Sequence, residues 1–348
     1  MKHNKEVKKM LAVVKEHEGP GFAVKDVPMP ELREDDVIIR VKSVGICGSD
    51  IPILAGTRKV PWPMIPGHEF AGDIFAVGPK VKGLALGDRV TSCLVIGCGD
   101  CKYCIEGKES LCDNLVETGI HVDGAFAEYV RVPAKTVRKL KDGTSYDLGA
   151  SVDPVASAYR TVKAAPITSK DTCVVFGPGP IGLYAVQLIR MRGVKCIICV
   201  GTNDDIDRLE LAKGFGADYT INSSVEDVVA RIREITNGEM VDFVQDCAGV
   251  QPVATAAMQV LKKGGLYGVT GLYHHPAELD LGKVVRSEVG VFGTICYTRQ
   301  EFEECLDFIE AGRIQVLPLI THHFPLKDME EAFKIVLARQ AIKVIMHP

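Results

Sequence analysis

The 348-residue sequence lacks any run of about 18 apolar residues, the length at which a helix becomes a candidate to cross a bilayer. Its start, Met1 to Lys9, is rich in lysine but lacks the apolar core of a secretory signal. The sequence therefore predicts a protein with no membrane partner, and the cytoplasm is its expected location.

The sequence also lacks an excess of charge of either sign. Its 41 basic and 45 acidic residues leave a net charge of −4, and the basic residues form no clusters. Nucleic acids and anionic membranes recruit proteins through concentrated positive charge, so neither is expected as a partner. The length and the 47% of hydrophobic residues fit about two globular domains of roughly 100–200 residues each.

Cysteine, in contrast, is abundant, with 12 residues in the chain. Five of them lie between Cys93 and Cys112, while Cys196 and Cys199 belong to an apolar run. Close spacing of cysteines in a cytosolic enzyme indicates metal binding more often than disulfides. Cys196 and Cys199 are expected in core packing, because free cysteine is among the most buried residue types.

The texture of the sequence changes along the chain. Residues 10 to about 155 combine glycine, proline and short valine-rich runs, such as 36–41 and 87–91, which predicts an irregular β-rich domain. In residues 156 to 295, strand-length apolar runs alternate with helical patterns. Strands are expected at 172–176, 194–200, 219–222, 241–246, 265–269 and 289–295, and helices at 181–192, 209–215, 225–236 and 252–261. This alternation predicts a parallel sheet covered on both faces, followed by a helix over 302–311 and a short tail of strand and helix.

A glycine-rich turn, Gly177-Pro-Gly179-Pro180-Ile181-Gly182, joins the first strand of the alternating region to its first helix. In that context the first glycine permits the turn, the second lets the backbone approach a pyrophosphate, and the third allows close packing. The helix N-terminus offers free N–H groups to the phosphates. The turn predicts a dinucleotide site, and a packing turn without a ligand is the alternative.

The second strand of this region ends at Gly201, where an acidic residue would normally bind the adenosine ribose. Gly201 would not repel a 2′-phosphate, so NADP is an option, although no arginine follows Thr202 immediately and the nearest is Arg208. Asp204 or Asp205 could instead reach the ribose of NAD. The sequence leaves NAD and NADP open.

Two constellations point to metal. Cys98, Cys101, Cys104 and Cys112 are spaced so that four thiolates can close around one zinc ion, which would fix a loop that has little core of its own. Cys47 and the pair His68-Glu69 are dispersed. Taken singly, Cys47 could be a small core residue and His68 a buried histidine with its hydrogen bonds satisfied. Together they offer ligands for a catalytic zinc that is held by three protein ligands. Spacing does not reveal the third ligand.

These motifs together resemble the zinc-containing medium-chain alcohol dehydrogenase superfamily. The matching segments are Gly45-Ile-Cys-Gly-Ser-Asp50, Gly67-His-Glu-Phe-Ala-Gly72, the four-cysteine lobe, Asp123-Gly-Ala-Phe-Ala-Glu-Tyr129, the dinucleotide glycines and Pro318-Leu-Ile-Thr-His-His-Phe-Pro-Leu326. The resemblance implies an α/β protein with a GroES-like catalytic domain over residues 1–157, a doubly wound Rossmann domain over 158–295 and a return to the catalytic domain over 296–348.

The resemblance also assigns roles. Cys47 and His68 match catalytic zinc ligands, Asp153 matches the third ligand, and Glu69 matches an acid that binds zinc directly or through water. Asp50 matches the carboxylate that orients the histidine, and Ser49 matches the hydroxyl that receives the substrate proton. Many relatives carry a histidine at the outer end of this proton relay. This chain has Pro52 there, so the relay must end differently.

The implied activity is hydride transfer between a secondary alcohol and NAD or NADP, with one catalytic and one structural zinc per chain and a small-molecule substrate. Similarity is greatest to the polyol, 2,3-butanediol and threonine dehydrogenase branch. Sorbitol-type enzymes usually carry Arg-Tyr where this chain has Gly293-Thr294, which favours a short diol or amino alcohol, with an L-threonine 3-dehydrogenase-like or sorbitol-like enzyme as alternatives. A homodimer or homotetramer is implied.

Three other classes of protein would share part of this sequence pattern. A nucleic-acid-binding zinc module would explain the four cysteines, but the acidic balance opposes it. A zinc-free quinone reductase would lack both metal sets. A non-catalytic cofactor-binding protein would retain the fold without the chemistry.

Overall fold

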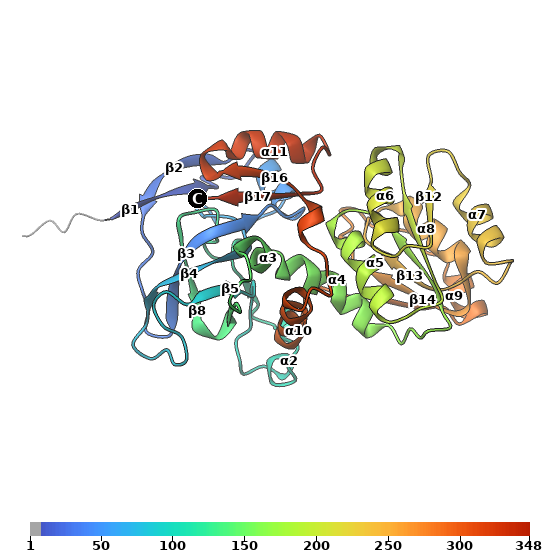
Figure 1. Cartoon of the computed structure of the whole chain (residues 1–348), viewed down its shortest axis with the longest axis horizontal. Coiled ribbons are helices and arrows are strands. Elements are labelled where there is room, and N and C mark those ends of the chain that lie inside the picture. The colour runs from blue at the N-terminus through green and yellow to red at the C-terminus, as the bar shows by residue number, and fades with distance from the viewer. Residues whose placement is uncertain (1–7) are drawn as a thin grey trace, which may run out of the picture. The chain divides into compact units, whose positions relative to one another are not determined.

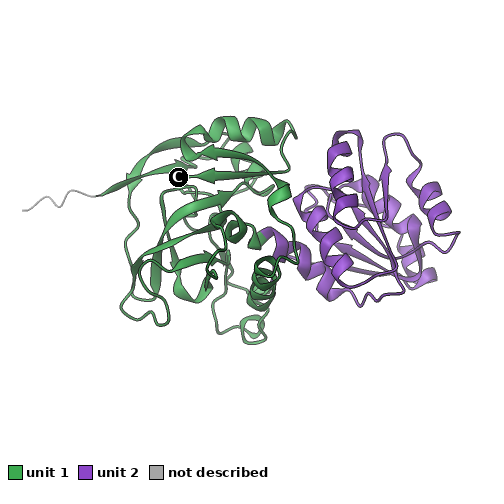
Figure 2. Ribbon diagram, in the orientation of Figure 1, with its two compact units in different colours: residues 1–153, 298–348 green, residues 154–297 purple. Residues whose placement is uncertain are grey.

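The computed structural model describes residues 8–348, so most of the lysine-rich start lies outside the described residues. The chain forms two compact units (Figure 2). Unit 1 comprises the residues up to Asp153 together with Thr298–Pro348, and unit 2 comprises Pro154–Tyr297. The domain boundaries expected after residues 157 and 295 remain predictions. Over residues 8–348, no helix is long and apolar enough to cross a membrane.

Unit 2 is built on a six-stranded parallel sheet. In spatial order its strands are β12 (Tyr219–Asn222), β11 (Cys196–Gly201), β10 (Thr172–Phe176), β13 (Val241–Asp246), β14 (Leu261–Val269) and β15 (Gly290–Gly293). Counted along the unit, this order is 3-2-1-4-5-6, which is the doubly wound dinucleotide-binding arrangement. All five residues of β10 are buried, as expected for a central strand covered on both faces.

Helices connect these strands (Figure 1). They are α5 (Pro180–Met191), α6 (Ile206–Gly214), α7 (Val228–Ile235), α8 (Gln251–Val260) and α9 (Leu281–Ser287), and α4 (Val152–Ala164) precedes the sheet. The sequence did not predict α9. Its apolar residues Leu281 and Val285 are 68% and 77% exposed, so α9 carries no buried apolar stripe from which it could have been recognised. Of the two free cysteines in β11, Cys199 is buried and Cys196 is half-buried.

Unit 1 contains a seven-stranded sheet. The strands run in the order β16 (Ile320–Pro325), β17 (Lys343–His347), β3 (Asp36–Gly45), β4 (Glu69–Val77), β5 (Arg89–Ser92) and β9 (Val137–Lys139), and β8 (Tyr129–Pro133) also pairs with β3. Two further sheets have two antiparallel strands each: β1 (Lys9–Val14) with β2 (Ala23–Pro28), and β6 (Val95–Ile96) with β7 (Val116–Glu117). The unit is therefore β-rich, as the sequence predicts.

The C-terminal segment belongs to the sheet of unit 1. Strand β17 runs parallel to β16 and antiparallel to β3, with Ile345 opposite Gly45. The helices of this unit are α1 (Asp50–Ala55), α2 (Lys102–Ile105), α3 (Tyr146–Ala150), α10 (Arg299–Glu310) and α11 (Met329–Leu337). Helix α10 begins three residues before the expected Phe302, because Thr298 and Glu301 form a capping box at its start.

Candidate functional site

The turn from β3 into α1 carries Cys47, Ser49 and Asp50. Asp50 is fully buried and accepts a hydrogen bond of 2.9 Å from the backbone N–H of Cys47, which fixes the cysteine relative to the helix. Ser49 occupies the N-cap position of α1, but its side chain makes no capping hydrogen bond. Its half-buried hydroxyl is therefore not committed to the helix.

His68 and Glu69 stand where β4 begins, after a glycine that the backbone requires. Gly67 has φ of +91°, and a Cβ there would lie 2.8 Å from the ring of Phe126. Asp123 steadies the same loop by accepting a hydrogen bond of 2.9 Å from the N–H of Ile65. The segment that starts at Asp123 thus supports the loop that delivers His68.

The fold brings Cys47, His68 and Glu69 together. Each offers one ligand atom, and the three atoms all lie within 4.8 Å of one another. A thiolate, an imidazole nitrogen and a carboxylate oxygen are donors that zinc accepts. The Nδ1 atom of His68 is buried without a hydrogen-bond partner, 3.9 Å from Oδ1 of Asp50. Asp50 is thus positioned to orient the ring when Nε2 is engaged by a metal.

The acidic groups around Cys47, His68 and Glu69 also favour a positive charge at this cluster. Burial alone would lower the pKa of His68, but Cys47, Asp50 and Asp153 raise it, and the net result is a pKa well above the ordinary range of histidine. The surrounding acidic groups therefore stabilise positive charge at this point. A divalent ion would supply that charge, so the residues present fit a zinc ion.

Asp153 is buried at the start of α4, and its charge acts on His68. Its carboxylate does not join the three atoms that lie within 4.8 Å of one another. Pro52 lies within α1, and its carbonyl oxygen accepts hydrogen bonds from the N–H groups of Thr57 and Arg58. It contributes no side-chain proton donor or acceptor to this turn.

Lys343 is a member of this site that sequence reasoning missed. Its ammonium group donates to the carboxylate of Glu69 and, at 2.9 Å, to the carbonyl oxygen of Ile46. A Cβ on Gly45 would collide with the Glu69 carboxylate and the Lys343 side chain, so glycine leaves the room for this pair. The available signal was a lysine inside the apolar run from Ala341 to Met346, where a charge needs a partner.

The four-cysteine lobe forms a second cluster. The sulfur atoms of Cys98, Cys101, Cys104 and Cys112 all lie within 4.8 Å of one another, with 3.9 Å for the pairs 98–104 and 101–112. A tetrahedron with zinc–sulfur bonds of about 2.3 Å has edges of about 3.8 Å. None of the four cysteines forms a disulfide. The backbone N–H of Cys104 helps to lower the pKa of Cys101 to about 7, which favours a thiolate. The lobe fits a closed zinc site.

The dinucleotide motif in unit 2 has the expected conformation. Gly177 turns with φ of +87°, and a Cβ on Gly182 would collide with the carbonyl oxygen of Gly177. Pro180 is the first residue of α5, and Ile181 is half-buried beside it. Around Gly179 no atom lies within 4 Å of a Cβ position. The turn therefore leaves open space at the helix N-terminus, where a pyrophosphate fits.

At the end of β11, glycine stands where the dinucleotide fingerprint has an acidic residue. A Cβ on Gly201 would lie 2.9 Å from the Pro178 ring. Asp205 turns inward, where its carboxylate accepts hydrogen bonds from the N–H and hydroxyl of Thr202 at 3.0 and 2.8 Å. It also forms an ion pair of 3.1 Å with Arg208.

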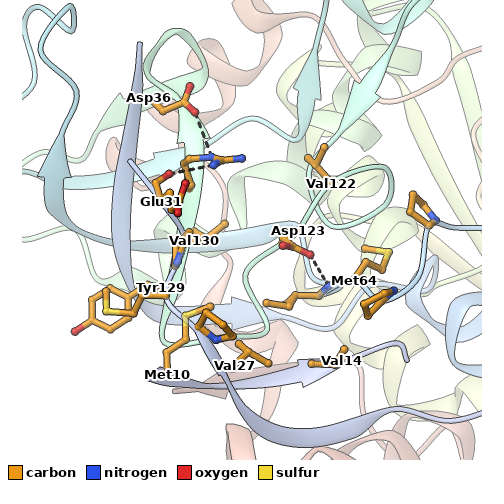
Figure 3. Close-up of a pocket in the computed structure, with 18 of the residues that line it drawn as sticks. Met10, Val14, Val27, Glu31, Asp36, Met64, Val122, Asp123, Tyr129 and Val130 are labelled. Atoms are coloured by element: carbon orange, nitrogen blue, oxygen red, sulfur yellow. Dashed lines mark hydrogen bonds and ion pairs between the residues drawn. The ribbon is translucent and has the colours of Figure 1, made fainter. Parts of the chain in front are cut away.

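A cavity of about 880 Å³ lies elsewhere in unit 1 (Figure 3). Its lining includes apolar residues of β1, β2 and β8, such as Met10, Val27 and Val130, together with residues of several loops. None of Cys47, His68 and Glu69 is among its lining residues. The cavity is therefore separate from the candidate metal site.

Comparison with known proteins places the chain in a family. Residues 33–142 match the alcohol dehydrogenase GroES-like domain, and residues 180–311 match the zinc-binding dehydrogenase domain. The chain is 34% identical to sorbitol dehydrogenase from Halalkalibacterium halodurans, over 97% of this chain and 99% of that protein. It is 32% identical to L-threonine 3-dehydrogenase from Proteus mirabilis, over 97% and 99%. A zinc-binding dehydrogenase from Sinorhizobium meliloti, solved bound to NADP, superposes with a TM-score of 0.92 at 31% identity, covering 98% of this chain and all of that one.

The chain therefore belongs to the zinc-dependent medium-chain alcohol dehydrogenase superfamily. It is an oxidoreductase that acts on CH–OH groups with zinc and a nicotinamide cofactor. The predicted fold class, with a GroES-like domain and a Rossmann-type parallel sheet, is confirmed.

Proposed function

We propose that this enzyme oxidises a secondary alcohol that carries a neighbouring polar group, at a zinc ion held by Cys47, His68 and an adjacent carboxylate. The observation that carries the proposal is the convergence of the Cys47 and His68 ligand atoms beside the carboxylate of Glu69, with all three atoms within 4.8 Å of one another. The four-cysteine lobe holds a second, structural zinc, because four thiolates leave no coordination position for a substrate.

The carboxylate at the catalytic zinc is assigned to Asp153. Glu69 already neutralises Lys343, with which it forms a buried ion pair, so zinc would have to share its carboxylate. Asp153 is buried, and its charge raises the pKa of His68. Glu69 then acts as the neighbouring acid, held close to the metal by Lys343.

Zinc, when bound, supplies Lewis acidity that lowers the pKa of the substrate hydroxyl, and the nicotinamide accepts a hydride. Ser49 receives the hydroxyl proton through its side-chain oxygen, which the helix cap does not use. Asp50 orients His68 from the buried side. Since Pro52 offers no group that transfers protons, a relay from Ser49 would have to end at water or, when the cofactor is bound, at its hydroxyls.

The substrate class follows from the relatives and from one departure. The relatives named above include a sorbitol dehydrogenase and an L-threonine 3-dehydrogenase, whose named substrates carry a secondary alcohol beside a polar group. At Gly293-Thr294 this chain has no cation, and the Thr294 hydroxyl forms a hydrogen bond of 2.5 Å with Thr161. A short diol or amino alcohol is therefore preferred to a long sugar alcohol.

Cofactor binding is assigned to the glycine turn and the end of β11. Gly177, Gly179, Pro180, Ile181 and Gly182 form the pyrophosphate site. Gly201, Thr202 and Arg208 face the adenosine ribose, where the inward turn of Asp205 removes one source of repulsion for a 2′-phosphate. We propose further that the protein is cytoplasmic and forms a homodimer or homotetramer. Light scattering on the purified protein tests the oligomeric state.

The decisive experiment is turnover of purified, zinc-analysed protein. A panel of 2,3-butanediol, L-threonine, sorbitol and simple secondary alcohols is assayed with NAD⁺ and NADP⁺ in parallel. The assignment predicts about two zinc ions per chain and reduction of cofactor by a short diol or amino alcohol. Cys47→Ser should lose one zinc and all turnover while still binding cofactor, whereas Cys196→Ala, in β11 and outside both clusters, should keep both zinc ions and turnover. Full turnover by Cys47→Ser of verified metal content would contradict the site.

A further inference from the structure

Asp147, His323 and His347 form a third cluster of metal-ligating side chains in unit 1. One ligand atom from each lies within 4.8 Å of the other two. The three residues come from α3, β16 and β17 (Figure 1). None of them belongs to the two zinc clusters described above, and neither the reaction nor the cofactor site uses them.

The sheet places the two histidines on one face. In the parallel pair of β16 and β17, His323 is opposite Ile345, which is two residues before His347. Side chains alternate along a strand, so His323 and His347 project from the same face as diagonal neighbours. Their ring centroids are 5.3 Å apart.

The third ligand is held by the neighbouring strand. The hydroxyl of Ser43 in β3 donates a hydrogen bond of 2.6 Å to Oδ1 of Asp147. That bond fixes the carboxylate and leaves its other oxygen, Oδ2, 3.9 Å from Nδ1 of His323. The carboxylate therefore keeps one oxygen available toward the histidines.

Hydrogen bonding also sets the tautomer of His347. Its Nδ1 lies 2.9 Å from the carbonyl oxygen of Lys42, and because a carbonyl can only accept, Nδ1 must carry the proton. The lone pair is then on Nε2, which lies 3.0 Å from Nδ1 of His323. The ring planes are 10° apart and their centroids are 5.3 Å apart. Both ring edges thus present nitrogen to the same space. A backbone carbonyl that fixes the second nitrogen is the usual arrangement behind a metal-bound histidine.

We propose that Asp147, His323 and His347 bind a divalent transition-metal ion, with zinc as the ion to test, through Oδ2, Nδ1 and Nε2. Two imidazoles and a carboxylate are a donor set that suits zinc. Ligand atoms at about 2.0–2.2 Å from a tetrahedral ion lie roughly 3.3–3.6 Å apart, and the observed separations of 3.0 and 3.9 Å bracket that range. On binding, the proton at Nδ1 of His323 moves to solvent or to Nε2 of the same ring.

The surroundings allow an ion to enter. The side chains of His323 and Asp147 are 48% and 23% exposed, so water can complete the coordination. The ion would connect α3 to the two C-terminal strands. Because an ion that binds only the folded state stabilises it, the site makes the stability of unit 1 depend on zinc concentration.

Zinc titration of the holoenzyme, already loaded at its other sites, tests this proposal. The wild-type protein should bind one further zinc ion, counted by equilibrium dialysis and elemental analysis. His323→Gln and Asp147→Asn should each weaken this binding by about 100-fold. Loss of a residue that only supports a metal ligand typically costs about 10–100-fold in metal affinity, and these two residues are proposed as ligands themselves. His323 is exposed, so its replacement carries little risk to folding, and circular dichroism checks that each variant is folded.

His322→Gln is the matched control, because His322 is the adjacent residue of the same strand. Its Nδ1 lies 3.0 Å from Oγ1 of Thr321, and its ring lies parallel to that of Phe324. This variant should retain the additional zinc and the zinc-dependent rise in Tm, which His323→Gln should lose. Binding that is absent in the wild type, or that persists equally in all variants as an adventitious ion, would overturn the proposal. The readouts are zinc content and Tm, so the result is independent of whether the proposed substrate is turned over.

Discussion

The ammonium group of Lys343 donates to the carboxylate of Glu69 in unit 1, and the two side chains are only 2% and 1% exposed. Lys343 belongs to the C-terminal strand β17, whereas Glu69 opens β4. Burial opposes the charged form of Lys343, but Glu69, Cys47 and Asp50 raise its pKa. The C-terminal segment therefore contributes a positive charge directly beside the proposed catalytic zinc.

Replacement of Lys343 by methionine should destabilise unit 1 strongly. The variant leaves the charge of Glu69 buried without its partner, and loss of one member of a buried pair typically costs about 3–5 kcal/mol. Urea unfolding of the zinc-loaded protein measures this change. Lys343→Met/Glu69→Gln should recover much of the loss, because no uncompensated charge remains. Lys334→Met, which removes only exposed ion pairs of α11, should change stability by less than about 1 kcal/mol. Equal effects of the two single variants would contradict the buried pair.

Two glycines of the cofactor turn should respond differently to alanine. Gly179→Ala adds a methyl group into space with no protein atom within 4 Å, so stability should hold while the KM for the cofactor rises. Gly182→Ala places its methyl group against the carbonyl oxygen of Gly177, so unit 2 should lose stability as well as cofactor binding. Thermal unfolding together with cofactor titration separates these effects. If Gly179→Ala bound cofactor normally, the pyrophosphate assignment would fail.

Cys98→Ser should release the structural zinc. Removal of one thiolate opens the four-sulfur cluster, and the lobe has only the short elements α2 and a 3-10 turn, Glu109–Leu111, around it. A loss of about 2 kcal/mol would lower Tm by roughly 4–8 °C in a unit of this size. Elemental analysis should find one zinc ion fewer per chain. Cys196→Ala in β11 is the control and should keep the full zinc content.

The stability of the zinc-free protein should fall as pH rises above about 6.5, the ordinary pKa of histidine in an unfolded chain. Although burial acts against it, the pKa of His68 is raised by Cys47, Asp50 and Asp153. The proton on His68 therefore stabilises the folded state fully below the unfolded pKa, and this contribution disappears as pH passes through the raised value. Urea unfolding between pH 5.5 and 9 should show this decline in the wild type, and a smaller one in His68→Gln. Identical profiles would mean that His68 holds no such proton.

Much of unit 2 could be predicted from its sequence. The bounds of β12 and β13 agree with the predicted strands 219–222 and 241–246, because buried parallel strands appear as apolar runs between polar turns. The start of α10 was placed three residues late, since its capping box lies before the first apolar residue. Helix α9 was missed because its apolar side chains Leu281 and Val285 are exposed and it has no fully buried residue.

The spacing of residues along the chain predicted one metal cluster, and the family resemblance was needed for the other. Cys98, Cys101, Cys104 and Cys112 are close in the chain, so their spacing alone predicted a metal site. Cys47 and His68 were recognised through the family resemblance, and the structure brings their ligand atoms together. Their assignment as zinc ligands, and that of Asp153, stays a prediction for the experiments above.

By itself, the sequence determined the family, the parallel sheet of unit 2, the glycine turn and the four-cysteine lobe. Each of these depends on residues that are neighbours along the chain or on a periodic pattern of apolar side chains. Only the tertiary structure decided the partner of Glu69 and the cluster of Asp147 with His323 and His347. These contacts join β4 to β17, and α3 to the C-terminal strands, across 274 and 176 residues. No local pattern encodes them, because they arise from the pairing of β17 with β3 in the sheet of unit 1.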